Sequence, residues 1–188
     1  MANIIIDVQP RGTASAYINA PFDEGQDTLQ KQGYHIISLE DNAQLRIQEG
    51  KEAVISRNGN WVREGVLYVP KKGIFLTKKS PILANAREAT QCHRQDRNYC
   101  LTDEQVEQAL DGAMEITVTS IPAYDLHNHP LTVYGFGNNA KAYGEFLTEA
   151  KIKNLSIALT SLQDKPFAYQ LWFRGLGYDS VLYGDYRY

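Results

Sequence analysis

The chain has 188 residues, of which 43% are hydrophobic and 22% are charged, and its formal net charge is −3. This composition predicts a packed globular protein and argues against a disordered chain. No apolar run approaches the roughly 18 residues that cross a bilayer, and the start "MANIIIDVQP" lacks the basic lead and long apolar stretch of a signal peptide. We therefore expect a cytoplasmic protein that makes no contact with membranes.

The basic residues are scattered along the chain, so the long-range positive field that holds nucleic acid is missing, and we expect no nucleic-acid partner. The stretch "KKGIFLTKK" is a local exception, because Lys71, Lys72, Lys78 and Lys79 bracket a predicted strand. These lysines either protect a sheet edge and flank a turn, or they contact an anion. The sequence alone leaves both interpretations open.

The N-terminal part reads as short strands and turns. "NIIIDV" and "SAYINA" are rich in β-branched and aromatic residues and are separated by "QPRGT", which predicts a hairpin. "FDEGQDTLQKQG" predicts a short helix that ends at Gly33, and "YHIISLE" then predicts a strand.

Residues 42–54 are ambiguous between helix and strand. Residues 60–83 predict two or three antiparallel strands, with "PKKG" as the turn between "VLYV" and "IFLT". Residues 84–101 are polar and show no clear period, and a helix starts after them. Thr102 with Gln105 forms a capping box, and Gly112 ends this helix.

Two cysteines, Cys92 and Cys100, lie eight residues apart, a spacing that fits no common zinc motif. Together with His93, His127 and His129 they would supply enough ligands for a tetrahedral site if the fold brought both segments together. The alternative is a pair of reduced thiols and surface histidines. We assign no metal site from the sequence.

The last third alternates between strands and helices. "MEITVTSI", "PLTVYGF" and "LSIALTS" predict strands, and Asn138 or Asn139 is expected to cap a helix that runs to Ala150. Residues 164–176 predict a second helix that buries Phe167 and Trp172, and "YDSVLYGDYRY" predicts a final strand or hairpin.

This order implies at least one parallel pair of strands. The predicted fold class is α/β in the mixed α+β sense, with a central mixed, partly parallel sheet flanked by helices and a strand-rich N-terminal half. The expected divisions are residues 1–83, 84–113 and 114–188, or one continuous domain.

The segments "NNAKAYGEFLTEA" and "AYQLWFRGLGYDSVLY" make residues 131–185 similar to the C-terminal half of the GCN5-related N-acetyltransferases, with "VLYVPKKGIFLT" as a weaker match to the central hairpin of that family. The resemblance implies a GNAT-like fold in which main-chain N–H groups at a helix start bind the pyrophosphate of acetyl-CoA. The residues implied in cofactor binding are Gly135, Gly137, Asn138, Asn139, Ala140, Lys141, Ala142 and Gly144.

The same resemblance implies catalytic residues. Phe173 occupies the position where the family has a tyrosine that acts as general acid. Tyr169 or Tyr178 would then protonate the leaving thiolate. Glu115 is the candidate general base, with Asp125 and the two histidines near it as alternatives.

Two functions follow from these features. The first is an acyl-CoA-dependent N-acetyltransferase that acts on the amine of a small molecule or a protein. The second is a non-catalytic binding or interaction protein on a GNAT-like scaffold, which the missing basic loop residue and the missing tyrosine favour. The sequence does not indicate the oligomeric state.

Overall fold

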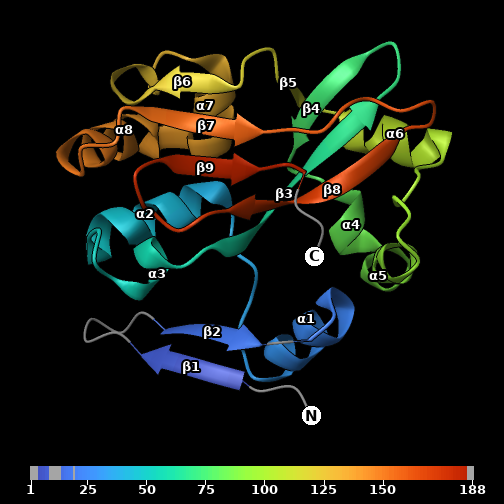
Figure 1. The fold of residues 1–188 in the computed structure, drawn as a ribbon, viewed down its shortest axis with the longest axis horizontal. Coiled ribbons are helices and arrows are strands. Elements are labelled where there is room, and N and C mark those ends of the chain that lie inside the picture. Colours follow the sequence, from blue (N-terminus) through green and yellow to red (C-terminus); the bar gives the residue numbers. More distant parts are fainter. Residues whose placement is uncertain (1–3, 9–13, 19, 186–188) are drawn as a thin grey trace.

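The computed structural model describes residues 4–8, 14–18 and 20–185. Its centre is a seven-stranded mixed sheet in the order β5-β4-β3-β8-β9-β7-β6 (Figure 1). The strands are β3 (Asn60–Val69), β4 (Gly73–Thr77), β5 (Met114–Glu115), β6 (Ser120–Pro122), β7 (Asn154–Ala158), β8 (Phe167–Phe173) and β9 (Ser180–Tyr183). The pair β7 and β9 is parallel and the other pairs are antiparallel, so the predicted mixed, partly parallel sheet is confirmed.

Helices flank this sheet, as expected. They are α1 (Phe22–Lys31), α2 (Leu39–Glu49), α3 (Val54–Arg57), α4 (Pro81–Ala84), α5 (Ala86–Arg94), α6 (Asp103–Leu110), α7 (Pro130–Phe136) and α8 (Ala140–Glu149). Two short 3₁₀ helices, η1 (Ala123–Asp125) and η2 (Gly137–Asn139), precede α7 and α8 respectively. Within the described residues, none of the helices has the length and apolar character that crossing a membrane requires.

The central strands β3 and β8 separate two hydrophobic cores. Side chains on one face pack with α2, α7 and α8, and those on the other face pack with α1, α4, α5 and α6. The first core takes Val66, Tyr68, Phe167 and Tyr169 from these strands, and the second takes Leu67, Val69 and Ala168. Burying each large apolar side chain stabilises the fold by roughly 1.5–3 kcal/mol, so both faces hold the sheet in place.

Several local predictions are confirmed. Strands β1 (Ile4–Val8) and β2 (Ala14–Ile18) form the expected antiparallel hairpin, whose predicted turn at 9–13 lies outside the described residues. The β3–β4 hairpin forms around "PKKG", and both hydrogen bonds of the capping box join Thr102 and Gln105 at the start of α6. These elements depend on contacts between residues that are close in sequence, which the sequence displays directly.

Four predicted elements are wrong. "MEITVTSI" is not one strand, because β5 and β6 lie at opposite edges of the sheet with residues 116–119 between them. "YHIISLE" makes an isolated bridge, Ile37 with Val62, before α2 begins at Leu39. "PLTVYGF" is helix α7, because His129 caps it and Pro130 occupies its first turn. Residues 167–173 form strand β8, since a run that is almost wholly buried carries no period that distinguishes a helix from a strand.

A buried arginine fixes the loop between β8 and β9. Arg46 of α2 donates hydrogen bonds to the hydroxyl of Tyr143 at 3.4 Å and to the carbonyls of Phe173 and Arg174 at 3.2 and 3.0 Å. Its guanidinium lies 3.7 Å from the centre of the Phe173 ring. Burial lowers the pKa of Arg46, and neutral oxygens and an aromatic face replace water around its charge.

Replacing Arg46 with Met should therefore lower the free energy of unfolding by about 2–4 kcal/mol, because buried carbonyls lose their donor at a cost of about 1–3 kcal/mol each. Urea denaturation measures this loss. The matched control is Arg57→Met at the exposed end of α3, for which we expect a change within about 0.5 kcal/mol. Equal stability of the two variants would show that Arg46 does not hold the loop.

Candidate ligand-binding groove

The site begins at an irregularity in β3. Trp61 pairs with Trp172 of β8, and the next pair is Gly65 with Gln170, so three residues of β3 lie opposite one residue of β8. Such a bulge bends the strand and redirects its side chains. Arg63 is exposed as a result, whereas its neighbour Glu64 is only 2% exposed.

The side chain of Gln170 closes the bulge. Its amide nitrogen donates to the carbonyl of Glu64 at 2.9 Å and also to the carbonyl of Val62, and its amide oxygen accepts a hydrogen bond from the hydroxyl of Ser80 at 2.7 Å. Ser80 caps α4, so one buried amide connects β3, β8 and the start of that helix. A Cβ on Gly65 would lie 2.8 Å from the Ser80 hydroxyl, so this close approach needs glycine.

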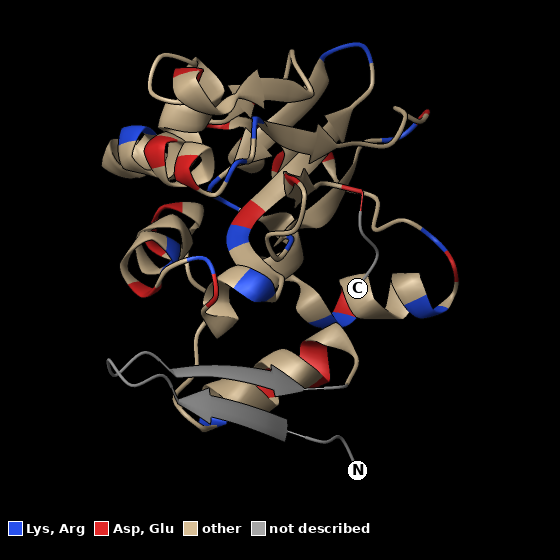
Figure 2. Ribbon diagram, turned by 60° about the vertical axis from the view of Figure 1, so that its left-hand side comes forward, with Lys and Arg blue, Asp and Glu red and all other residues tan. Residues whose placement is uncertain are grey.

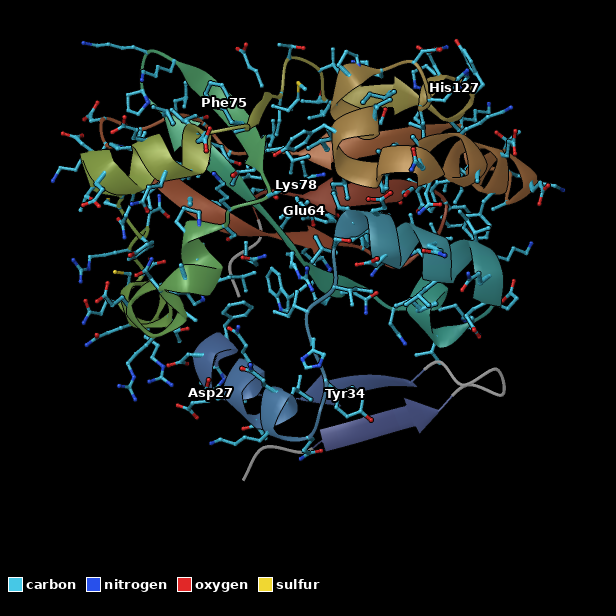
Figure 3. All side chains as sticks on the ribbon, turned by 180° about the vertical axis from the view of Figure 1, so that it is seen from behind. Asp27, Tyr34, Glu64, Phe75, Lys78 and His127 are labelled. Carbon is cyan, nitrogen blue, oxygen red and sulfur yellow. The ribbon has the colours of Figure 1, made fainter. Side chains whose placement is uncertain are left out.

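Glu64 joins the bulge to α2. Its carboxylate accepts a hydrogen bond from the main-chain nitrogen of Leu39, the first residue of α2, at 2.9 Å. Burial raises the pKa of Glu64, and the hydrogen bond from Leu39 and the charges of Lys78 and Arg63 oppose that rise. Figure 3 shows Glu64 and Lys78 next to each other, between α2 and α4.

A groove of about 460 Å³ opens beside the bulge, between the segment after β4, α4 and α6. Its polar lining consists of three cations, one hydroxyl and three amides: Arg63, Lys78, Lys79, Ser80, Asn85, Gln105 and Gln108. Apolar atoms of Pro81, Leu83, Ala84 and Ala109 complete it, and the described lining includes no Asp or Glu. Elsewhere the two signs of charge are intermixed along the ribbon (Figure 2).

The two lysines of the groove are held differently. The main-chain nitrogen of Lys78 donates to the hydroxyl of Tyr134 at 3.1 Å, and its ammonium lies 5.0 Å from the centre of that ring. The ammonium of Lys79 forms an exposed ion pair with Asp111 at 2.5 Å. The other lysines of "KKGIFLTKK", Lys71 and Lys72, lie in the β3–β4 turn, as the first interpretation of this stretch expects, and the anion contact stays a prediction.

The residues predicted to bind coenzyme A lie at a corner between two helices. Gly135 is in α7, Gly137, Asn138 and Asn139 form η2, and Ala140, Lys141, Ala142 and Gly144 are in α8. The corner is packed against Glu40, whose carboxylate accepts a hydrogen bond from the main-chain nitrogen of Asn138 at 3.2 Å. A Cβ on Gly137 would lie 2.2 Å from that carboxylate, and one on Gly144 would lie 2.3 Å from the carbonyl of Ala123. Both glycines therefore serve internal packing here.

The three predicted catalytic residues lie on separate parts of the fold. Tyr169 is buried on β8, and its hydroxyl donates to Asn98 at 2.5 Å. Tyr178 is fully exposed in the β8–β9 loop, and Glu115 is exposed on β5, from which β4 and β3 separate β8. The structure does not gather them around one pocket.

The cysteines and histidines considered for zinc are divided between two regions. Cys92 and His93 lie on α5, Cys100 follows that helix, and His127 and His129 lie between η1 and α7. Both cysteines are free thiols. Across the part of the chain that the structure describes, no three His, Cys, Asp or Glu side chains are grouped so as to hold a metal ion.

Comparison with known proteins identifies the fold. No protein-family model and no curated protein matches the sequence. A solved structure described as "Accommodation of massive sequence variation in Nanoarchaeota by the C-type lectin fold" matches 99% of this chain and 92% of its own, with a TM-score of 0.67 and 15% sequence identity. The chain therefore has a C-type lectin fold.

This finding corrects the predicted resemblance to the GCN5-related N-acetyltransferases, which is wrong. Residues 131–136, where the resemblance implied a strand, lie in helix α7, and residues 168–173, where it implied a second helix, lie in strand β8. The prediction of acyl transfer is overturned with it, and the predicted amine partner is not tested. Binding of acetyl-CoA itself stays an untested prediction, now without the resemblance that implied it.

Sequence reasoning missed the buried polar residues that frame the groove, Glu64 and Gln170, although the chain carries a signal for them. Gln170 lies within the largely apolar run "FAYQLWF", and Glu64 directly precedes the apolar run "GVLYV". Because a buried polar group needs a partner, such residues indicate a specific contact between the two strands. The partner itself becomes visible only when the strands are paired.

We expect Gln170→Leu to lower the free energy of unfolding by about 2–4 kcal/mol, because two buried carbonyls and the Ser80 hydroxyl lose their partner. Gln108→Leu, on the exposed wall of the same groove, is the matched control and should change stability by at most about 0.5 kcal/mol. Chemical denaturation compares both with the wild type. A loss for Gln170→Leu no larger than that of the control would refute this role.

The pKa of Glu64 predicts a pH dependence of stability. Because its pKa is raised in the folded state, the folded protein binds more protons than the unfolded chain over the interval between the two pKa values. The contribution of Glu64 to stability is therefore present below the ordinary pKa and is lost as pH rises through the raised one. In Glu64→Gln this part of the pH dependence should vanish in denaturation curves, and an unchanged slope would exclude Glu64 as its source.

Proposed function

We propose that this chain is a non-catalytic binding protein whose ligand-binding site is the groove beside the β3 bulge. The observation that carries this proposal is a groove of about 460 Å³ with a rigid buried frame and a lining of cations, amides and one hydroxyl. This volume falls in the range of roughly 300–1,000 Å³ that small-molecule sites occupy.

The hydrogen bonding of the groove favours binding over catalysis. The hydroxyl of Ser80 donates its proton to the amide oxygen of Gln170, which is not a base, so Ser80 is not activated as a nucleophile. Gln105 is also engaged, because it accepts from the main-chain nitrogen of Thr102 and donates to the hydroxyl of Tyr99. These contacts fix the walls in place before a ligand arrives, which reduces the entropy cost of binding.

The similar solved structure supports a binding role in a second way. It is described as a C-type lectin fold that accommodates massive sequence variation, which implies a scaffold that stays intact while other positions change. In the present chain the frame residues Glu64 and Gln170 are buried, whereas Arg63, Lys78 and Gln108 are exposed. We propose that this division lets the groove residues set the ligand preference independently of the frame.

A thermal-shift screen tests the proposal. The panel contains neutral sugars, phosphorylated and sulfated sugars, dicarboxylates, nucleotides and acetyl-CoA. We expect at least one class to raise the Tm, because a ligand at 100 times its Kd stabilises the native state by about 2.7 kcal/mol.

The variant Ala84→Trp should abolish the shift by filling the groove, since Ala84 is an exposed part of its lining. Gln91→Trp, exposed on α5 and outside the lining, is the matched control and should keep it. If no class shifts the wild type, or if the shift survives in Ala84→Trp, the groove is not the ligand site.

A further inference from the structure

We infer that the groove binds a phosphate or sulfate monoester with its oxyanion between Arg63 and Lys78, and that binding is coupled to proton uptake by Glu64. The inference rests on the proposed function and adds the chemical class of the ligand. It follows from the two cations of the groove lining and from the buried carboxylate of Glu64, which Figure 3 shows next to Lys78.

Arg63 is positioned to receive an anion. It lies on the exposed side of the bulge, and its Nε donates to the carbonyl of Ile36 at 3.2 Å, which anchors the side chain. Within the described residues, its two terminal nitrogens have no hydrogen-bond partner of their own. A guanidinium with a fixed stem and two available nitrogens matches the paired oxygens of a phosphate or sulfate.

Lys78, which also lines the groove, supplies the second positive charge. Its position is set by the main-chain hydrogen bond to Tyr134 and by the contact of its ammonium with that ring. Lys79 adds little net charge, because Asp111 is paired with it. The lining thus offers the charges of Arg63 and Lys78 and contains no carboxylate of its own, which suits an oxyanion better than a neutral ligand.

The size of the groove indicates an ester and not a free inorganic ion. About 460 Å³ exceeds the space that one oxyanion fills, and the remaining wall carries amides together with apolar atoms of Pro81, Leu83 and Ala84. A wall of this kind accommodates a hydroxylated, partly apolar body such as a sugar ring. The contacts of the oxyanion then provide most of the binding affinity. The contacts of the wall determine which ester is bound.

Glu64 makes this binding depend on protons. The groups that face it are Arg63 on its own strand, Lys78 after β4, Tyr134 on α7 and the main-chain N–H of Leu39 on α2. While ionised, Glu64 cancels part of the field of Arg63 and Lys78; once protonated, it leaves both charges for the ligand. By linkage, a bound anion favours the protonated carboxyl, and acidification tightens anion binding.

Calorimetric titration with inorganic sulfate tests the charge coupling, because the charge of sulfate does not change between mildly acidic and mildly alkaline pH. We expect the wild type to bind sulfate about fivefold or more tightly at the acidic end. Glu64→Gln should bind tightly at both ends and lose the pH dependence. Lys78→Ala should lose at least tenfold in affinity, whereas Lys71→Ala, in the β3–β4 turn, should match the wild type.

Parallel titrations with glucose, glucose 6-phosphate and glucose 6-sulfate separate the possible ligand sources. We expect one or both esters to bind more tightly than sulfate alone and the neutral sugar to bind at least tenfold more weakly. Equal binding of glucose, sulfate affinity unchanged in Lys78→Ala, or a pH dependence that persists in Glu64→Gln would overturn the inference. A neutral ligand found in the groove by the thermal-shift screen would leave the proposed function standing and remove only this inference.

Discussion

The bulge in β3 is the constraint on which the rest of the site depends. Between the pairs made by Trp61 and Gly65, the strand carries two more residues than β8 can match, so two main-chain carbonyls would be left without ladder partners. The amide of Gln170 satisfies them from the neighbouring strand and at the same time holds Ser80 at the start of α4. The groove exists because this single buried side chain stabilises an irregular strand.

The same bulge places opposite charges on opposite sides of one strand. Arg63 faces solvent, while Glu64 turns inward and accepts a hydrogen bond from the main-chain nitrogen of Leu39 at the start of α2. Burying a charge costs solvation free energy, which oriented dipoles offset. Glu64 lies at the start of a helix, and Arg46 contacts main-chain carbonyls and the face of an aromatic ring. The exposed side chains of the groove do not stabilise buried charges in this way. They can therefore differ without loss of the fold, as a binding surface on a stable scaffold requires.

The parts of the fold that could be predicted are those encoded locally. The "PKKG" hairpin and the capping box at Thr102 each depend on residues a few positions apart. The error at residues 167–173 has a different origin, because a strand buried on both faces has the same apolar run as a buried helix. The glycine corner at Gly137 looked like a phosphate site because glycine fits both roles, and only the fold reveals that Glu40 already occupies it. The groove was missed because its frame joins β3 to β8, about 100 residues apart in sequence.

The most direct test of the central claim is an amide chemical-shift map of the wild-type protein titrated with sulfate at mildly acidic pH. If the β3 bulge frames an anion site, the largest shifts should fall on Arg63, on residues 78–85 and on Gln105 and Gln108, and they should saturate together. Shifts centred on the corner at residues 137–140, or shifts spread over all exposed lysines without saturation, would contradict it.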